Sequence, residues 1–370
     1  VIARNPAAMS RFDRAELSIL GSYIVPDAEV HGVKDPVQGK PSRLDSSDII
    51  NDGFVPTFYY IQPVNDKIAV GLGMFSGYGL VSEYEKDYEV GAAGGKTDLL
   101  TYNINPSISF KATDKLSLGA GFDATYAKAT LERNVGDLGA GLGGLPANTQ
   151  LFLLEGDTWG YGWNAGALFE FNENHRIGLA YRSKIDLDFE GDFTGVLKNG
   201  GQKTAATLDI SLPATAEFSG YHKLNQNFAI SYSALWTQWS DFTELKALSS
   251  NCGANQECFS KEEKYDDNMR YSVGTEYYLD DVTLRAGFAY DEQAGETTLS
   301  IPDTDRYWYT AGATYKANQD LSFDFALAYI FTKEIKFTET VPTSPTTGLE
   351  YGFEGKGDAY IASAQMNYRF

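Results

Sequence analysis

The chain carries few side chains of the kinds that catalyse reactions. Its three histidines, His31, His175 and His222, are widely separated in the sequence. No Gly-x-Ser-x-Gly, His-Glu-x-x-His or phosphate-binding glycine-rich motif accompanies them. A catalytic or metal-binding histidine needs partners close by, so we interpret each one as a solvated surface residue. The residues therefore predict no enzyme, no metal site and no cofactor.

The two cysteines, Cys252 and Cys258, lie in one long segment of mixed charge. Such a pair is neither a disulfide framework nor a four-ligand zinc pattern. In an oxidising compartment we expect a disulfide between them, which would close a small loop. Two unpaired thiols are the alternative.

Two cations near the ends of long polar segments are candidates for anion binding. Arg133 lies in the segment 130–137, and Lys261 lies in the segment 258–264. A cation beside apolar walls can bind the head group of an amphipathic anion. A solvated loop charge is the simpler interpretation, and from these residues alone we favour it.

The composition limits the class of protein. The chain has 370 residues and a net charge of −20, which argues against nucleic acid as a partner because phosphate binding needs a basic surface. The mean hydropathy is −0.31, and no apolar run reaches the ~18–20 residues of a membrane-spanning helix. Aromatic residues make up 14% of the chain, including 24 Tyr and 22 Phe, and these residues suit strands and membrane interfaces.

Alternation of apolar and polar residues predicts β-strands along the whole chain. In the last stretch, 358–370, Tyr360, Met366 and Tyr368 fall on one face, and Ser363 and Asn367 fall on the other, as only a strand arranges them. The predicted strands are 15–25, 54–64, 68–80, 100–110, 116–126, 158–171, 176–189, 208–222, 228–239, 269–278, 282–290, 306–315, 321–332 and 358–370.

Six short turns alternate strictly with seven long gaps between these fourteen strands. An even strand number with alternating short and long connections is typical of outer-membrane barrels, and closure leaves no unpaired backbone in lipid. We therefore predict an all-β fold, a 14-stranded antiparallel transmembrane β-barrel in which the last strand pairs with the first. A soluble two-sheet protein is the alternative.

Several ionisable residues fall on the polar face of predicted strands. They are Asp123, Arg182, Arg285, Asp324 and Arg369. Because barrel interiors are polar, we expect a structural charge network there rather than a permeation path.

The beginning of the chain resembles the Asn-Pro-Ala segment of the long-chain fatty acid transporter family (FadL type) of Gram-negative outer membranes. The resemblance is carried by Asn5-Pro6-Ala7 within 4–14, and by the segments 127–137, 158–166, 179–183 and 300–306. It covers nearly the whole chain. The chain starts at Val1 and shows no signal peptide, so we expect a processed or truncated amino terminus that lacks most of the family's hatch.

The resemblance implies a division of the chain and a set of site residues. Residues 1–13 would be the end of an amino-terminal hatch, with Asn5, Pro6 and Ala7 as its Asn-Pro-Ala element, and residues 14–370 would form the barrel with long extracellular loops. Arg133 and Lys261 would bind the ligand carboxylate, which reverses the preference for solvated loop charges. Ser76, Gly77, Tyr78 and Gly79 would form a kink in the third strand beside a lateral opening.

The function implied by the resemblance is passive outer-membrane transport of long-chain fatty acids or similar hydrophobic molecules, with lateral exit through the barrel wall. Uptake of neutral aromatic hydrocarbons is one alternative. A general diffusion porin and a structural or adhesive barrel without transport are others. We expect a monomer in contact with outer-membrane lipid and lipopolysaccharide.

Overall fold

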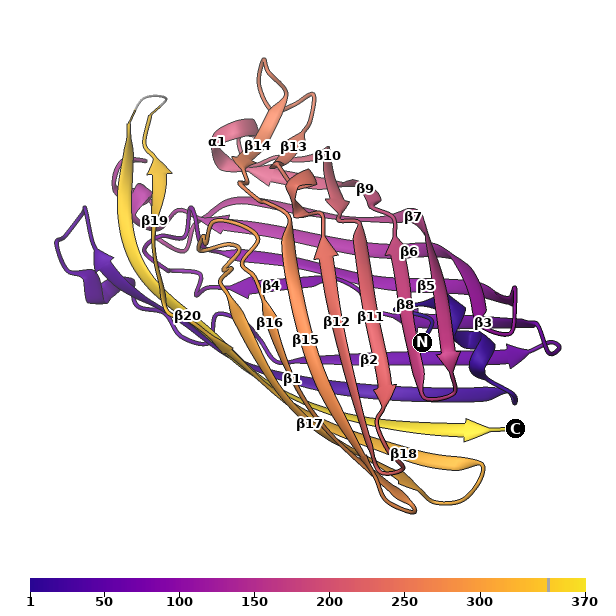
Figure 1. Ribbon diagram of the computed structural model, residues 1–370. Helices are drawn as coiled ribbons and strands as arrows, with labels where there is room; N and C mark the ends of the chain where they lie inside the picture. Colours follow the sequence, from indigo (N-terminus) through magenta and orange to yellow (C-terminus); the bar gives the residue numbers. More distant parts are fainter. Residues whose placement is uncertain (345–346) are drawn as a thin grey trace.

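The last strand of the chain pairs with the first and closes a barrel. In the computed structural model, which describes residues 1–344 and 347–370, β1 (Glu16–Lys34) and β20 (Gly348–Arg369) run antiparallel with Glu16 opposite Arg369. Each remaining wall strand pairs with its neighbours in chain order (Figure 1). The predicted 14-stranded antiparallel barrel is confirmed.

The other wall strands are β2 (Gly53–Pro63), β3 (Ile68–Phe75), β5 (Lys96–Lys111), β6 (Leu116–Asn134), β7 (Gln150–Asn172), β8 (His175–Arg182), β11 (Thr215–Lys223), β12 (Phe228–Thr237), β15 (Asn268–Tyr278), β16 (Val282–Asp291), β17 (Arg306–Lys316) and β18 (Leu321–Thr332).

The segments predicted as long gaps contain further strands, and in this respect the prediction was wrong. These strands are β4 (Gly79–Glu83), β9 (Ile185–Gly195), β10 (Lys203–Leu212), β13 (Glu244–Leu248), β14 (Glu257–Glu262) and β19 (Ile335–Pro342). They extend the sheet beyond the barrel at the end opposite the short turns (Figure 1). Short helices complete the structure: η1 (Pro6–Arg11), η2 (Pro41–Leu44), η3 (Gly136–Ala140), α1 (Val196–Asn199) and η4 (Trp239–Asp241).

Three predicted strands are each divided in two. The predicted strand 68–80 is β3 and β4, the strand 176–189 is β8 and the start of β9, and the strand 208–222 is the end of β10 and β11. Pro213 lies between β10 and β11, and proline has no N–H to donate to a strand ladder. Period-2 alternation continues through such breaks, so the pattern alone does not reveal them.

The short turns have a common local design. In four of them an asparagine side chain accepts hydrogen bonds from the backbone two and three residues later, and these asparagines are Asn65, Asn172, Asn225 and Asn318. A side-chain acceptor of this kind mimics a backbone turn and reverses the chain within a few residues. The turns therefore form locally and place consecutive strands side by side.

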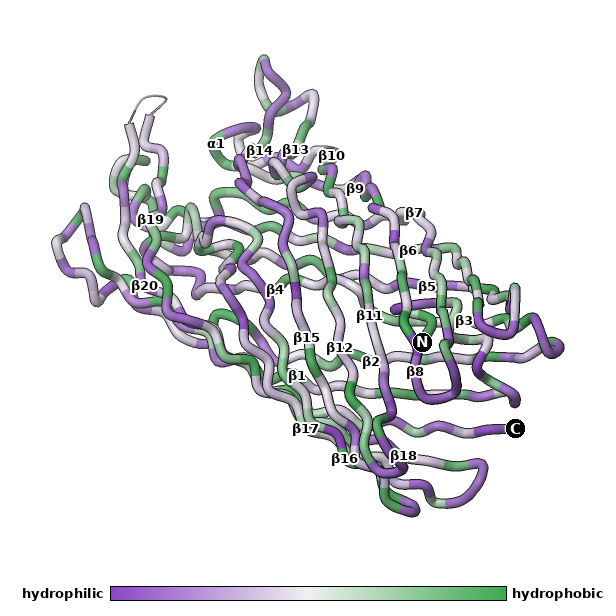
Figure 2. The backbone as a smooth tube through the Cα atoms, in the orientation of Figure 1, coloured by the Kyte–Doolittle hydropathy of each residue, from purple (hydrophilic) through white to green (hydrophobic). Residues whose placement is uncertain are grey.

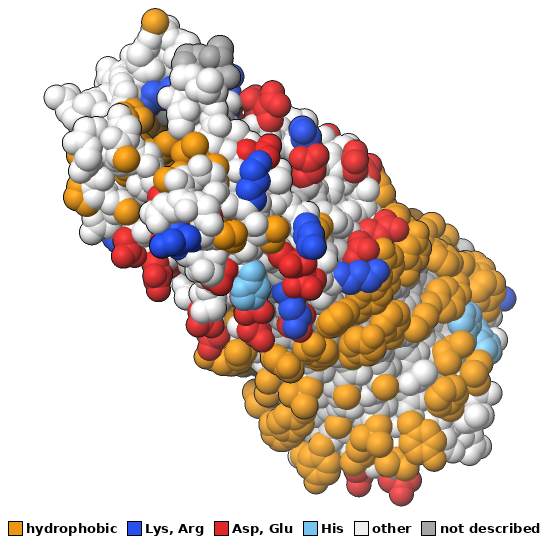
Figure 3. Space-filling view, turned by 90° about the vertical axis from the view of Figure 1, so that its left-hand side faces the viewer, with side chains coloured by type: hydrophobic (Ala, Val, Ile, Leu, Met, Phe, Trp, Pro, Cys, Tyr) orange, Lys and Arg blue, Asp and Glu red, His pale blue; other side chains and the backbone are white. Residues whose placement is uncertain are grey.

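One face of the wall strands is apolar and exposed, as a lipid-facing surface requires. On β6 and β7 this face includes Leu118, Phe122, Trp159, Tyr161 and Trp163. Green and purple residues alternate along many wall strands in Figure 2. In Figure 3 hydrophobic side chains cover the lower half of the surface, and charged side chains gather next to them toward the long-loop end. Among the described residues no helix is long and apolar enough to cross a bilayer.

The interior of the barrel contains the predicted charge network except for Arg369, which is exposed at the end of β20 and pairs with Glu16. Arg182 forms an ion pair with Asp123, whose side chain is fully buried. On the opposite wall, Arg285 lies 3.9 Å from Asp324 and 3.5 Å from Glu276. Each of these charges is balanced within the wall, so the network is a structural feature of the lumen.

Candidate functional site

An apolar cavity lies beneath the long-loop end of the barrel, and we call it the outer cavity. Its volume is about 340 Å³. Six of its apolar lining residues are Leu99, Leu131, Phe189, Leu208, Leu212 and Ile301. Most of them lie on strands that continue past the lipid-facing surface. They line the cavity because alternate residues of those strand extensions point inward. The extensions therefore enclose a hydrophobic space that the barrel alone would not form.

A second cavity lies deeper in the barrel, and we call it the lumen cavity. Its volume is about 450 Å³, and its lining includes Asn103, Thr125, Asn164 and Arg182. Among the described residues, Asn103 Oδ1, Thr125 Oγ1 and Asn164 Nδ2 are buried without a hydrogen-bond partner. Buried polar atoms of this kind bind water readily and disfavour contact with hydrocarbon.

Tyr78 and Trp239 form part of the boundary between the two cavities, since both residues line both spaces. Their rings meet edge to face with centroids 6.1 Å apart. The Tyr78 hydroxyl donates a hydrogen bond to the Pro213 carbonyl at 2.9 Å, which ties this boundary across the lumen to the break between β10 and β11. The boundary thus separates an apolar space from a polar one.

The barrel wall is interrupted at 76–78, between β3 and β4. Both strands pair with β5, but β2 pairs only with β3 on this side, from Phe58 opposite Met74 to Pro63 opposite Ala69. The first residues of β2 are therefore paired only with β1. Gly77 and Tyr78 line both cavities, and a Cβ atom added to Gly77 would meet nothing within 4 Å. The candidate kink residues Ser76, Gly77, Tyr78 and Gly79 lie at or next to this break.

Arg133 lies at the end of β6, beyond the lipid-facing surface, and is only 2% exposed. Its guanidinium donates to the Lys96 and Glu132 carbonyls at 2.9 and 2.8 Å and to Thr97 Oγ1 at 3.1 Å. Within residues 1–344 and 347–370 it forms no ion pair. Burial lowers the pKa of Arg133 to about 10. The interpretation of Arg133 as a solvated loop charge is wrong.

Lys261 lies on β14 with its ammonium group among polar side chains. Its Nζ donates to Thr298 Oγ1 at 3.0 Å and to Ser300 Oγ at 2.7 Å, and it lies 3.5 Å from Glu263 Oε1. Burial raises the pKa of Glu263, whereas Lys261 and Arg133 both lower it. The fold thus brings the two cations, which are far apart in the sequence, to the same buried carboxylate. Thr97, a hydrogen-bond partner of Arg133, and Ile301, next to the Lys261 partner Ser300, line the outer cavity.

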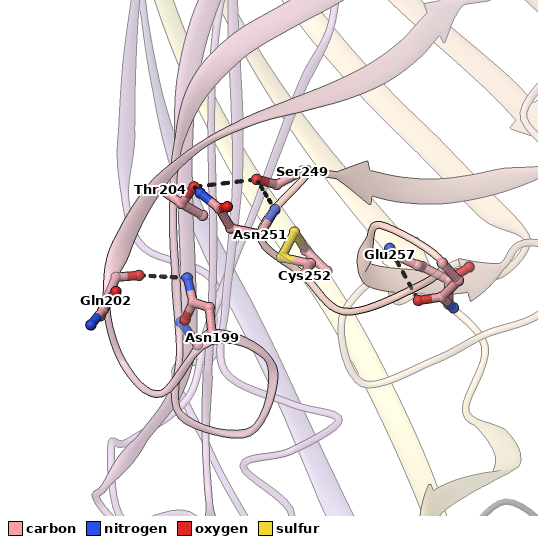
Figure 4. The surroundings of a disulfide bond; sticks show 10 residues. Asn199, Gln202, Thr204, Ser249, Asn251, Cys252 and Glu257 are labelled. Atoms are coloured by element: carbon pink, nitrogen blue, oxygen red, sulfur yellow. Dashed lines mark hydrogen bonds between the residues drawn. A yellow bond between two sulfur atoms is a disulfide. The ribbon is translucent and has the colours of Figure 1, made fainter.

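Cys252 and Cys258 are joined by a disulfide between β13 and β14 (Figure 4). Both residues are buried in the apolar cluster around the outer cavity. The Asn251 side chain donates to Thr204 Oγ1 at 2.7 Å, and this contact links the hairpin to β10 (Figure 4). The disulfide lies in the long-loop region and closes the tip of a hairpin that covers the outer cavity.

The Asn5-Pro6-Ala7 element lies inside the barrel. Asn5 Nδ2 donates to the Ala167 and Leu179 carbonyls at 3.1 and 3.2 Å, and Asn5 Oδ1 accepts from Ala7 N at 3.0 Å. The wall is lined by glycine where this segment passes. A Cβ at Gly166 would lie 2.0 Å from Asn5 Oδ1, and a Cβ at Gly119 would lie 2.3 Å from Ala7 N. The segment therefore fits the lumen because those wall positions lack side chains.

Two groups of residues were not anticipated. His175 and His222 are not solvated singly, because their Nδ1 atoms lie 3.0 Å apart on paired strands. In the long-loop region, Arg43 forms ion pairs with both Asp35 and Asp137. No sequence signal identifies these groups, because their members meet only when β8 pairs with β11 and when the long loops pack against one another.

Comparison with known proteins shows the family. Residues 1–370 match the model described as "Outer membrane protein transport protein (OMPP1/FadL/TodX)". The chain belongs to this family. Over its full length, this OMPP1/FadL/TodX member is 37% identical to the long-chain fatty acid transport protein of Escherichia coli O6:H1, and the match covers 88% of that protein. It is 39% identical over its full length to the 47 kDa outer membrane protein of Pasteurella multocida, and this match also covers 88% of the relative.

Solved structures share the fold of this OMPP1/FadL/TodX protein. A FadL homologue of Pseudomonas aeruginosa has a TM-score of 0.87 at 24% identity, over 99% of this chain and 93% of that one. The toluene transporter TodX of Pseudomonas putida has a TM-score of 0.70 at 18% identity, over 99% and 92%. The protein is an outer-membrane β-barrel of a transport family, whose named members are transporters or channels rather than enzymes.

Proposed function

We propose that the protein carries long-chain fatty acids, or hydrophobic molecules of similar shape, across the outer membrane by passive diffusion. The observation that carries the proposal is the apolar outer cavity of about 340 Å³ next to the break in the wall. Its volume lies within the range of roughly 300–1,000 Å³ found for small-molecule sites. Relatives named as long-chain fatty acid transport proteins support this ligand class.

We propose that the apolar walls bind the acyl chain and that Arg133 and Lys261 bind the carboxylate. Each buried CH₂ group contributes about 0.8 kcal/mol, so a long chain supplies most of the affinity. Neither cation is among the residues that line the cavity. Arg133 donates to Thr97, which lines it, and Lys261 donates to Ser300, next to Ile301, which lines it. A short rearrangement of these hydroxyl contacts would let the carboxylate replace them, and the cations would then orient the ligand.

We propose that the ligand leaves sideways through the break at Ser76–Gly79. The straight path leads through the lumen cavity, where an acyl chain would have to dehydrate Asn103 Oδ1, Thr125 Oγ1 and Asn164 Nδ2, three buried atoms without a hydrogen-bond partner among the described residues. Residues 1–13, proposed as the end of a hatch, occupy the lumen below. A closed barrel has no free sheet edge, which fits a monomer in contact with outer-membrane lipid and lipopolysaccharide.

The head-group assignment is tested with Arg133→Ala combined with Lys261→Met. Loss of charged hydrogen bonds worth about 1.5–3 kcal/mol is expected to weaken oleate binding about 10- to 100-fold and to leave oleyl alcohol binding unchanged. Lys264→Met is the matched control, because Lys264 is exposed and pairs with the equally exposed Glu296. Equal effects on the acid and the alcohol would refute the assignment.

The lateral path is tested at Gly77, where an added side chain enters open space. Gly77→Trp is expected to fill the break and reduce oleate uptake by cells at least about tenfold, and to weaken oleate binding to purified protein by much less, since Gly77 is one of many residues that line the outer cavity. Gly77→Ala is the control, since a single methyl group leaves most of the space open. Normal uptake by the tryptophan variant would contradict lateral exit here.

Neutral aromatic hydrocarbons are a second candidate ligand class. One end of the outer cavity is aromatic, with the Trp239 and Tyr265 ring centroids 5.9 Å apart and those of Phe242 and Tyr265 5.1 Å apart. Aromatic rings prefer tilted contacts of this kind with one another. Competition between palmitate and toluene for the purified protein distinguishes the two classes.

A further inference from the structure

Glu263 is a buried carboxylate beside the proposed head-group site. Its side chain is 2% exposed, and Oε1 lies 3.5 Å from Lys261 Nζ. At that distance the contact is an ion pair rather than a good hydrogen bond, and Oε1 has no hydrogen-bond partner among the described residues. Glu263 follows β14 two residues after Lys261, so both side chains point inward, whereas Glu262 between them is exposed.

The charges around Glu263 come from several elements. Lys261 of β14, Arg133 of β6 and Glu339 of β19 all act on its carboxyl group, and Glu263 itself acts on the Tyr265 hydroxyl. The set contains two cations and two carboxylates, so the cations are balanced without a ligand. A third carboxylate, from a fatty acid, would leave the buried cluster with a net negative charge, which burial disfavours.

We propose that Glu263 is an internal counter-ion that competes with the ligand head group for Lys261 and Arg133, so that an anionic ligand binds together with one proton taken up by Glu263. The inference rests on the proposed function. The proton comes from solution and adds to a Glu263 carboxylate oxygen, no covalent bond breaks, and the cluster keeps its net charge. Burial, which raises the pKa of Glu263, favours this protonation. Glu263 thereby makes capture of anionic ligands depend on pH.

The test uses purified full-length protein and two probes that do not titrate. Hexadecanesulfonate is permanently anionic, and hexadecanol is neutral. We expect sulfonate affinity to fall up to about tenfold per pH unit on going from pH 6 to pH 8.5, as coupling to one proton requires. Hexadecanol affinity is expected to stay constant, because it brings no charge to the cluster.

Glu263→Gln removes the competing charge without changing the size of the side chain. It is expected to abolish the pH dependence of sulfonate binding and to tighten that binding at least about tenfold at pH 8.5. Glu262→Gln, the exposed neighbour, is the matched control and is expected to behave as wild type. Glu263→Gln with wild-type affinity and wild-type pH dependence would overturn the inference.

Proton uptake by the wild-type protein provides a second test that needs no variant. Calorimetry in buffers of different ionisation enthalpy at pH 8 is expected to give one proton taken up per sulfonate bound, and no uptake would overturn the inference. Lys261→Met separates the two proposals. If it leaves sulfonate binding unchanged, the head-group assignment fails and this inference with it. If it weakens sulfonate binding while Glu263→Gln changes nothing, only this inference fails.

Discussion

Replacing Asn5 with alanine should release the amino-terminal segment from the barrel lumen. The side chain makes three hydrogen bonds, two to the Ala167 and Leu179 carbonyls and one from Ala7 N. Each such bond is worth about 1 kcal/mol net, and only the two bonds to the wall oppose displacement because the Ala7 bond lies within the segment, so Asn5→Ala should favour displacement by about 2 kcal/mol. The two carbonyls belong to the paired strands β7 and β8. Losing the hydrogen bond from Asn5 therefore adds little further free-energy penalty at these carbonyls. A change of about 2 kcal/mol corresponds to a roughly 30-fold higher population of displaced segment.

Ion conductance across planar lipid bilayers measures this displacement directly. We expect frequent channel openings for Asn5→Ala and rare ones for wild type. Gly166→Val should give the same result by a different route, because its Cβ would lie 2.0 Å from Asn5 Oδ1. Asn51→Ala is the matched control, since the Asn51 side chain donates an exposed hydrogen bond to Glu83 in the long-loop region. Wild-type conductance in both Asn5→Ala and Gly166→Val would refute the reasoning that this segment closes the lumen.

Two further predictions concern the long-loop region. The hydrogen bonds from Arg43 hold the pKa of Asp35 well below its usual range. The ionised Asp35 carboxylate therefore stabilises the folded loops fully above about pH 4, and this stabilisation is lost as pH falls through the lowered pKa. Asp35→Asn should therefore speed limited proteolysis of the loops at pH 7, and wild-type protection should persist to about pH 4. Joint replacement of Cys252 and Cys258 by serine should lower the stability of the β13–β14 hairpin by about 2 kcal/mol. Limited proteolysis should then cleave the hairpin faster, while hexadecanol affinity stays within about twofold of wild type.

The wall of the barrel could be predicted from local pattern because its determinants are local. Alternation along each strand sets the two faces, and turn residues such as Asn65 and Asn318 reverse the chain by bonding to backbone two and three residues away. The extensions above the membrane could not be predicted in the same way. Residues such as Phe189 and Leu208 alternate as in any strand, and their burial depends on the loops that cover them.

For the candidate site, the sequence predicted individual residues but not their environment. The sequence, through a family resemblance, singled out Arg133, Lys261 and the Asn5-Pro6-Ala7 element, and their proposed roles stay predictions. It did not indicate that Arg133 is 2% exposed or that the buried Glu263 carboxylate lies 3.5 Å from Lys261.

The sequence alone determined the strand order and the short turns, because each depends on neighbours within a few residues, and the even strand number with alternating connections predicted the closure of the barrel. The tertiary structure decided the outer cavity, the break at Gly77 and the charge balance at Glu263. Each of these depends on distances between strands that only the closed barrel brings together.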